Sequence, residues 1–232
     1  MIFKFNNTEI FFSFKSRKSD VTNVFLHGWG CDHESFLFCE EFLKNDNLLF
    51  VDFPPFGKSG KPYDWTIFTY ANMLISLCEH LGLKHLNLIG HSFGGRVAIL
   101  VSVLCKSQVK KVVLVDSAGL KPRRSITYWW RVYRFKLRRK LGWDVSKFGS
   151  CDYLALDEQM RKVFNNIVTM HLDDFLPYIK AETLVIFGKE DNVTPVYMAR
   201  RLKKRIKNSM QQFLRNSCVG SYTDFNVKIF SR

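Results

Sequence analysis

The amino-acid sequence lacks several features that would assign the chain to a class at once. None of its six cysteines stands in a Cys-x-x-Cys pair or in a cluster with histidine at metal-ligand spacing, which argues against a structural zinc and against a disulfide framework. The longest apolar stretch, residues 97–105, is about half of a membrane span and contains a serine. Charged and amide side chains interrupt the first seven residues before a signal-peptide core could form. These absences predict a soluble, cytoplasmic protein with reduced thiols and no metal.

Composition and charge narrow the class further. The chain has 232 residues, of which 47% are hydrophobic and 24% are charged, values that exclude disordered and fibrous proteins and allow one large α/β domain. The net charge of +14 is concentrated in two stretches without acidic residues, with nine lysines and arginines in residues 121–140 and six in residues 200–207. Such clusters can mark phosphate binding, but nothing else in the chain resembles a nucleic-acid-binding module. Nucleic acid is therefore not an expected partner.

Short apolar runs alternate with helical patterns along the chain. Runs of strand length occur at residues 11–14, 24–26, 48–52, 86–90, 112–116 and 183–188, and helical patterns occur at residues 35–44, 65–81, 93–105 and 195–206. The last four runs are almost continuously apolar, which indicates strands that are buried on both faces of a mostly parallel sheet. Strands that alternate with helices of this length predict an open, doubly wound α/β sheet.

One segment interrupts this alternation. Residues 117–181, about 65 in number, contain aromatic and basic helical stretches but no buried strand. A segment of that size is too long for a loop and predicts a small helical cap. It is inserted between the runs at residues 112–116 and 183–188, which we take as the sixth and seventh strands of the complete sheet. We therefore expect a core of residues 1–116 and 182–232. The cap of residues 117–181 would lie over the carboxyl ends of the strands, where such sheets bind ligands.

The candidate nucleophile is Ser92. It lies in the run GHSFGG of residues 90–95, between a predicted strand and a predicted helix, and so fits the G-x-S-x-G nucleophile elbow. This turn strains the backbone of the serine and leaves no room for side chains at Gly90 and Gly94. The hydroxyl then projects from the top of the sheet at a helix N-terminus, which favours a developing negative charge. The alternative is a glycine-rich turn with an incidental serine.

A second motif, HGWG at residues 27–30, follows an earlier predicted strand, where an oxyanion loop is expected. The backbone N–H groups of Trp29 and Phe93 would together hold the oxyanion of a tetrahedral intermediate, and each such donor contributes roughly 3–4 kcal/mol in a serine hydrolase. We interpret His27 as a buried structural histidine that bonds the backbone of this loop, and not as a general base.

These motifs resemble those of the α/β-hydrolase family, in particular its cap-bearing serine hydrolases (carboxylesterases and the carbon–carbon bond hydrolases of ring-cleavage products). The similarity covers about residues 20–208 and rests on HGWG at 27–30, DFPPFGKS at 52–59, GHSFGG at 90–95 and GKEDNVTP at 188–195. It implies an α/β-hydrolase fold and a hydrolase without a cofactor. It also implies that Asp191 is the carboxylate that orients a catalytic histidine, with a helix N-cap as the alternative role. Asp116 is a second possible acid, and Asp52 is expected to tether its loop.

The general base is missing from its expected place. The spacing of the family puts a Gly-His pair near Val219, but the sequence has no histidine after His171. A serine without a base is a poor nucleophile. Three explanations stay open: a tail that is divergent or read in a disturbed frame after about residue 208, a relative that keeps the pocket without turnover, or a recruited base, for which His33 and His171 are the candidates.

Aromatic and basic side chains interleave between residues 128 and 143. In the simplest interpretation, cap helices bury the aromatic rings against the core and leave lysine and arginine in water. The pattern also fits an entrance for a small anionic or aromatic substrate, or peripheral contact with an anionic membrane. The sequence thus predicts a serine hydrolase of a small ester or an activated carbonyl (carbon–carbon) substrate. A catalytically impaired relative, a binding or vestigial protein, is the alternative.

Overall fold

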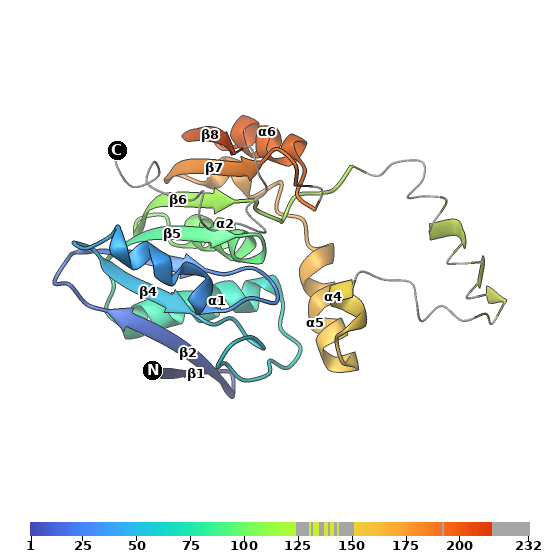
Figure 1. The fold of residues 1–232 in the computed structure, drawn as a ribbon, viewed down its shortest axis with the longest axis horizontal. Coiled ribbons are helices and arrows are strands. Elements are labelled where there is room, and N and C mark those ends of the chain that lie inside the picture. The colour runs from blue at the N-terminus through green and yellow to red at the C-terminus, as the bar shows by residue number, and fades with distance from the viewer. Residues whose placement is uncertain are drawn as a thin grey trace.

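A computed structural model of the chain describes residues 1–123, 151–191 and 193–214, together with single positions between 130 and 143. Its strands are β1 (Ile2–Phe5), β2 (Thr8–Lys15), β3 (Val21–Leu26), β4 (Asn47–Val51), β5 (His85–His91), β6 (Val109–Val115), β7 (Glu182–Gly188) and β8 (Ser209–Leu214). They form one sheet in the order β1-β2-β4-β3-β5-β6-β7-β8 (Figure 1). The pairs β1–β2 and β2–β4 are antiparallel and the other pairs are parallel. The predicted mostly parallel α/β sheet is confirmed.

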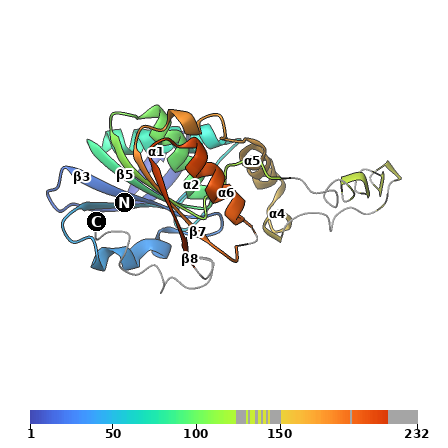
Figure 2. The same cartoon turned by 90° about the horizontal axis from the view of Figure 1, so that it is seen from above.

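Helices cover both faces of this sheet (Figure 2). The helices are α1 (Ile67–His80), α2 (Phe93–Leu104), α4 (Cys151–Leu154), α5 (Glu158–Thr169) and α6 (Val196–Arg205), with the 3-10 helices η1 (His33–Glu41) and η2 (Leu176–Tyr178). Of these, α4 and α5 cover neither face and lie beyond the ends of the strands (Figure 1). The apolar sides of α1, α2 and α6 belong to one large core cluster, whereas η1 packs on the opposite face. The helix predicted at residues 35–44 is this 3-10 helix, which begins two residues earlier because the carboxylate of Asp32 caps the N–H of Glu34.

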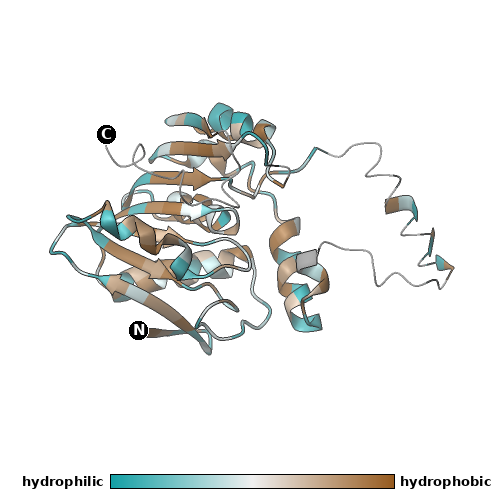
Figure 3. Cartoon of the chain, in the orientation of Figure 1, coloured by the Kyte–Doolittle hydropathy of each residue, from teal (hydrophilic) through white to brown (hydrophobic). Residues whose placement is uncertain are grey.

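The two central strands explain why the apolar runs are continuous. On β3 and β4, Phe25 and Phe50 stack with ring centroids 4.6 Å apart on the η1 side, while Leu26 and Val51 face the cluster of α1 and α2. Neighbouring side chains on a strand point to opposite faces, so a strand buried on both faces needs apolar residues at every position. The central strands are accordingly hydrophobic over most of their length, apart from the buried polar residues Thr22, Asn23 and Asn47 near their starts, whereas α6 is largely hydrophilic (Figure 3).

The two edges of the sheet differ from the sequence prediction. The hairpin of β1 and β2 is longer than the predicted run at residues 11–14, and it turns at Asn6 and Asn7, which both have positive φ. At the other edge, β8 forms although its sequence is poor in apolar residues. An edge strand has a partner on one side only, and Met210 is largely exposed, so polar side chains are tolerated there.

Between β6 and β7, the described residues contain helices and no strand. The two ends of this segment lie side by side: the N–H of Leu172 donates to the carbonyl of Gly119 at 2.8 Å, and the N–H of Lys121 donates to the carboxylate of Asp173 at 2.8 Å. The helical segment therefore leaves the sheet and returns to it at nearly the same place, beyond the carboxyl end of β6. The domain boundaries at residues 117 and 181 stay a prediction.

Candidate active site

The candidate site lies where the chain changes direction in the sheet. From β3 the chain continues to β4 on one side and later returns to β5 on the other side. Between two such strands the outgoing loops separate and leave a crevice at the carboxyl ends, where open α/β sheets bind ligands. His27 and Trp29 follow β3, and Ser92 follows β5, so the topology brings the two sequence motifs to this crevice.

Ser92 occupies a strained turn between β5 and α2. Its backbone has φ 47° and ψ −106°, a region that side-chain-bearing residues rarely adopt and that costs roughly 1–3 kcal/mol. Hydrogen bonds on both sides hold the turn: the N–H of Ser92 donates to Val115 at 3.0 Å, and its carbonyl accepts from Ala118 at 3.1 Å. The predicted strand–turn–helix geometry is thus present around this serine.

The glycines on either side of Ser92 allow the elements to approach each other. A Cβ atom added at Gly90 would lie 2.6 Å from the carbonyl oxygen of Gly94, and one added at Gly94 would lie 2.0 Å from the carbonyl oxygen of Leu26. The N–H of Gly94 also donates to the carbonyl of His27 at 3.1 Å. The first turn of α2 therefore packs directly on the end of β3, with no space for a side chain.

The HGWG loop lies beside this turn. A Cβ atom added at Gly28 would lie 3.6 Å from the Cβ of Ser92. Among the described residues, no hydrogen bond occupies the backbone N–H of Trp29 or of Phe93. Phe93 is the first residue of α2, where the helix dipole places a partial positive charge. Two unoccupied donors near a serine fit the requirement of an oxyanion hole.

Aromatic rings surround Trp29 and join the loop to α5. Its ring meets those of Phe56, Phe93 and Phe164 edge-to-face, with centroids 4.9, 5.5 and 5.1 Å away. Phe164 belongs to α5, in the helical segment between β6 and β7. An apolar aromatic wall thus stands next to the candidate oxyanion donor, and α5 supplies part of it.

Arg96 anchors α5 to the helix that begins at Phe93. Its guanidinium donates from Nη1 to the carbonyls of Ile167 and Met170 at 2.9 and 2.8 Å, in the last turn of α5, where a cation also complements the helix dipole. Burial lowers the pKa of Arg96 to about 10, so the side chain stays charged at neutral pH. This contact could not be predicted from the sequence, because it joins residues more than seventy positions apart.

His27 has the structural role expected for it. Its ring accepts at Nε2 from the N–H of Phe53 at 2.8 Å and donates from Nδ1 to the carbonyl of Gly28 at 2.7 Å. Burial lowers the pKa of His27 to about 4, so the ring is neutral at physiological pH. With both nitrogens bonded to backbone, His27 holds the two loops that follow β3 and β4 together.

This buried histidine predicts a loss of stability in acid. The folded pKa of about 4 is below the usual 6.5, so the unfolded chain takes up the proton first as the pH falls. The neutral His27 ring therefore contributes about 3 kcal/mol to the free energy of unfolding. This contribution is fully present above pH 6.5 and is lost as the pH falls from 6.5 to about 4. Urea unfolding of the wild type and of His27→Gln across this range should show a steeper decline for the wild type. Parallel declines would contradict the assignment.

Asp191 is buried next to the turn that precedes α6. Its carboxylate accepts from the N–H groups of Val193 and Thr194 at 2.6 and 2.9 Å and from the Thr194 hydroxyl at 2.7 Å. The alternative role, an N-cap of the following helix, is not observed, because α6 begins after Pro195 without a side-chain cap and these bonds close the turn before it. Burial lowers the pKa of His91, the residue before Ser92, and the negative charges of Asp116 and Asp191 oppose that shift. Asp191 thus acts electrostatically on the elbow, while its catalytic role stays a prediction.

The other two aspartates hold loops. Asp116 follows β6, and its Oδ1 accepts from the N–H of Gly188 at the end of β7 at 2.8 Å. Asp52 follows β4 and accepts from the N–H groups of His33 and Lys58 at 2.7 and 2.9 Å. The expectation that Asp52 tethers its loop is confirmed.

The two candidate histidines lie in different places. His33 pairs with Asp52 (Nδ1 to Oδ1, 2.7 Å), and its ring contacts that of Phe11 on β2 at 5.0 Å. Since β4 is two strand spacings from β5, about 10 Å, this pair lies away from Ser92. His171 immediately precedes Leu172, which bonds Gly119 in the segment that contacts the elbow. The position near Val219, where the base was expected, lies outside the described residues.

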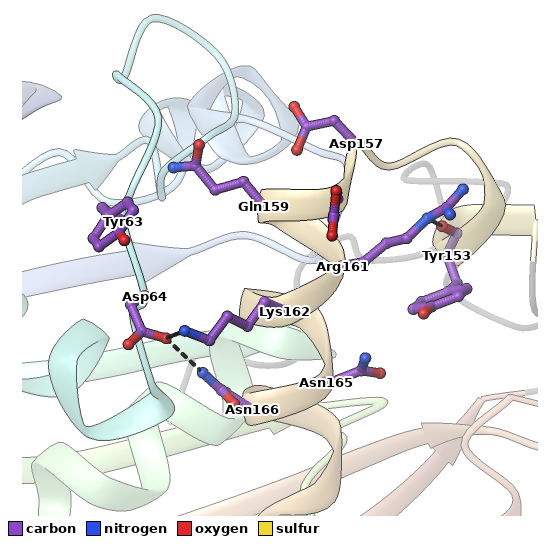
Figure 4. A pocket seen from close by; sticks show the side chains of 10 residues that line it. Tyr63, Asp64, Tyr153, Asp157, Gln159, Arg161, Lys162, Asn165 and Asn166 are labelled. Atoms are coloured by element: carbon purple, nitrogen blue, oxygen red, sulfur yellow. Dashed lines mark hydrogen bonds and ion pairs between the residues drawn. The ribbon is translucent and has the colours of Figure 1, made fainter.

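A polar hollow of about 1030 Å³ lies elsewhere, between α5 and the loop before α1 (Figure 4). Lys162 forms an ion pair with Asp64 at 3.0 Å, and Asn166 donates to the same carboxylate at 3.4 Å. These contacts attach α5 to the loop before α1. The residues lining the hollow do not include Ser92 or the oxyanion-hole candidates.

The described part of the chain contains no group of three or more histidine, cysteine or acidic side chains that could hold a metal ion. Within the same residues, every helix is too short or too polar to cross a lipid bilayer. Four cysteines in the described residues, Cys31, Cys39, Cys78 and Cys105, are free thiols.

Comparison with known proteins identifies the family. The model of the alpha/beta hydrolase family matches residues 24–217, most of the chain. The chain belongs to the α/β-hydrolase family. It is 26% identical over 239 residues to the uncharacterized hydrolase YugF of Bacillus subtilis, with 90% of this chain and 86% of that protein covered. It is also 33% identical over 108 residues to the putative esterase/lipase 2 of Mycoplasma genitalium, a shorter match that covers 45% of this chain and 40% of that protein.

Among solved structures, the esterase of Exiguobacterium antarcticum has the same fold. It superposes with a TM-score of 0.72 at 22% identity, and the match covers 94% of this chain and 91% of that one. The α/β-hydrolase fold that the motifs predict is therefore confirmed, and the relationship to proteins named hydrolases and esterases supports a hydrolase of this type.

Proposed function

We propose that this α/β hydrolase cleaves small esters with Ser92 as the nucleophile. The observation that carries the proposal is the turn at Ser92, with φ 47°, next to two backbone N–H groups (of Trp29 and Phe93) that no described residue occupies. A nucleophilic serine needs donors aimed at the oxygen on which negative charge develops, and this arrangement supplies them. The proposal assigns the oxyanion hole to these two groups.

The reaction has two steps. The Oγ of Ser92 attacks the ester carbonyl carbon, its proton passes to a base and then to the departing alcohol, and an acyl-serine remains. Water then attacks the acyl group, and Ser92 recovers its proton as the acid leaves. Asp191 would orient the base. Of the two candidate bases, His171 is favoured over His33, because its segment contacts the elbow whereas the pair of His33 and Asp52 lies two strand spacings away from the strand of Ser92.

The surroundings support a substrate with an apolar or aromatic group. The rings of Trp29, Phe56 and Phe164 form a wall beside the candidate oxyanion hole. Such a wall buries an acyl or aromatic group and leaves polar recognition to the backbone donors. The name of the esterase/lipase relative favours esters over carbon–carbon substrates. A small anionic substrate would also be attracted by the overall positive charge.

Labelling with a fluorophosphonate tests the nucleophile. This reagent phosphonylates activated serines, so wild-type protein should gain the mass of one adduct, and Ser92→Ala should gain none. Ser102→Ala removes a buried hydroxyl of α2 that bonds the carbonyl of Ile99, and it serves as the matched control that should still react. Equal labelling of the wild type and Ser92→Ala would overturn the assignment of Ser92.

The second candidate function is a relative that binds a ligand in this site without turnover. The observation that favours it is the lack of any histidine after His171. In this case the protein should bind an alkyl or aromatic carboxylate, seen by isothermal titration, while Ser92 resists the fluorophosphonate. Labelling of Ser92 would exclude this function.

A further inference from the structure

Large apolar side chains are exposed along one stretch of the helical segment. The described residues between 130 and 140 are helical, and Leu141 continues the pattern by donating its N–H to the carbonyl of Leu137 at 3.0 Å. Trp130, Tyr133, Leu137 and Leu141 are 62, 58, 42 and 52% exposed. We call these four residues the aromatic stripe. The simple expectation that aromatic side chains of this segment are buried against the core does not hold for Trp130 and Tyr133.

The spacing places the stripe on one side of a helix. Steps of three, four and four residues keep these side chains within an arc of about 80°. The rings of Trp130 and Tyr133 contact each other edge-to-face, with centroids 6.1 Å apart, as neighbours on one helix face do. By the same rotation, Lys140 lies beside one edge of the stripe and Arg134 beside the other. Both of these basic residues are exposed.

All charged residues of the stretch are basic. Residues 121–140 contain nine lysines and arginines and no acidic residue. A helix with tryptophan, tyrosine and leucine on one side and basic side chains along both edges fits the boundary between the headgroups and acyl chains of an anionic bilayer. The apolar face enters the acyl region while the cations contact the headgroups. We propose that the aromatic stripe docks the protein on anionic membrane surfaces.

The stripe favours a membrane over nucleic acid. Phosphate binding to a duplex needs cations, but gains little from leucine side chains exposed beside them. The helix α6 makes the contrast clear, because it is equally basic yet buries its apolar residues Met198 and Leu202 in the core. Charge alone therefore does not distinguish the two segments; the exposed apolar side chains do.

Vesicle sedimentation tests this proposal. Full-length protein is mixed with vesicles of phosphatidylcholine alone or of phosphatidylcholine and phosphatidylserine mixed three to one. We expect binding to the anionic vesicles that weakens with added salt, and little binding to the neutral ones. The double variant Leu137→Ser with Leu141→Ser should weaken binding roughly tenfold or more, since it removes two apolar contacts. Arg134→Glu with Lys140→Glu should weaken it at least as strongly.

A matched control carries the same charge change elsewhere. Arg200→Glu with Lys204→Glu alters two exposed basic residues of α6 and should leave binding within about twofold of the wild type, because α6 has no exposed apolar face. Brominated lipids provide a second readout: they should quench tryptophan fluorescence in the wild type and less in Trp130→Ala. Ser92→Ala should bind vesicles like the wild type, so the outcome is independent of the proposed catalysis.

Three results would overturn the proposal. They are a failure of the wild type to sediment with anionic vesicles, an equal loss of binding in the α6 control, and retention of binding by the Leu137→Ser, Leu141→Ser variant. Tight binding to duplex DNA that the same stripe variant retains would assign the basic stretch to nucleic acid instead.

Discussion

Ser92→Ala is expected to lower kcat/KM for p-nitrophenyl butyrate by at least about a thousandfold. The Oγ of Ser92 is the atom that would form the covalent bond, and loss of the nucleophile in a serine protease costs up to about a millionfold. Some hydrolysis above the solution rate should remain, because backbone donors such as those of Trp29 and Phe93 act without a nucleophile. Steady-state rates of wild type and variant measured side by side give the ratio.

The same substitution should leave the fold intact. Alanine keeps the backbone of the elbow, where the hydrogen bonds to Val115 and Ala118 do not involve the side chain of Ser92. Ser92→Gly should even raise the free energy of unfolding by about 1 kcal/mol, since glycine adopts a φ of 47° without steric strain. Full activity in Ser92→Ala would remove Ser92 from the mechanism. A Ser92→Gly variant that is less stable than the wild type would contradict the strain at this position.

Gly94→Ala is expected to destabilise the protein more than any other single methyl group added at a described glycine. The new Cβ would lie 2.0 Å from the carbonyl oxygen of Leu26, a backbone atom that no side-chain movement can displace. The start of α2 would have to separate from the end of β3. We expect a loss of more than about 3 kcal/mol, a large part of the stability of a typical domain.

Gly82→Ala is the matched control for this prediction. Gly82 has φ 65°, and a Cβ added there would meet no atom within 4 Å, so only the conformational cost of about 1 kcal/mol remains. Urea unfolding followed by circular dichroism compares the two variants. If Gly94→Ala unfolds at the same urea concentration as Gly82→Ala, the close approach of α2 to β3 is wrong.

The parts of the fold that the sequence predicts correctly are those fixed by local pattern and burial. The continuous run at residues 112–116 and the run at residues 183–188 became β6 and β7, because a strand covered on both faces tolerates no polar alternation. The elbow was predictable for a related reason. Only glycine fits at positions 90 and 94, and the sequence shows these glycines directly.

Contacts between distant segments could not be read from the sequence. Arg96 and the end of α5 are joined by hydrogen bonds to backbone carbonyls, which any residue type at 167 or 170 could supply. The contact between Trp29 and Phe164 depends on where α5 returns over the sheet. For the hairpin of β1, the pair Asn6-Asn7 was an available signal, because asparagine tolerates the positive φ of a tight turn.

The search for the general base shows the same limit. His33 and His171 were equal candidates by sequence, because position along the chain does not give distance in the fold. The strand order separates them: His33 lies with Asp52 beyond β4, and His171 lies in the segment that contacts Gly119 and, through it, the elbow. His171→Gln is therefore the histidine substitution expected to lower turnover, while His33→Gln should act on stability through the loss of its bond to Asp52.

The most direct test of the central claim is the stoichiometry of the first turnover. On rapid mixing of excess p-nitrophenyl butyrate with the wild type, acylation of Ser92 should release one equivalent of p-nitrophenolate per chain ahead of the steady state. This burst should be absent in Ser92→Ala. The burst arises because attack of water on the acyl-serine is slower than acylation, so its amplitude counts the acyl-serine formed. A progress curve of the wild type that coincides with that of Ser92→Ala from the first milliseconds onward would contradict the account.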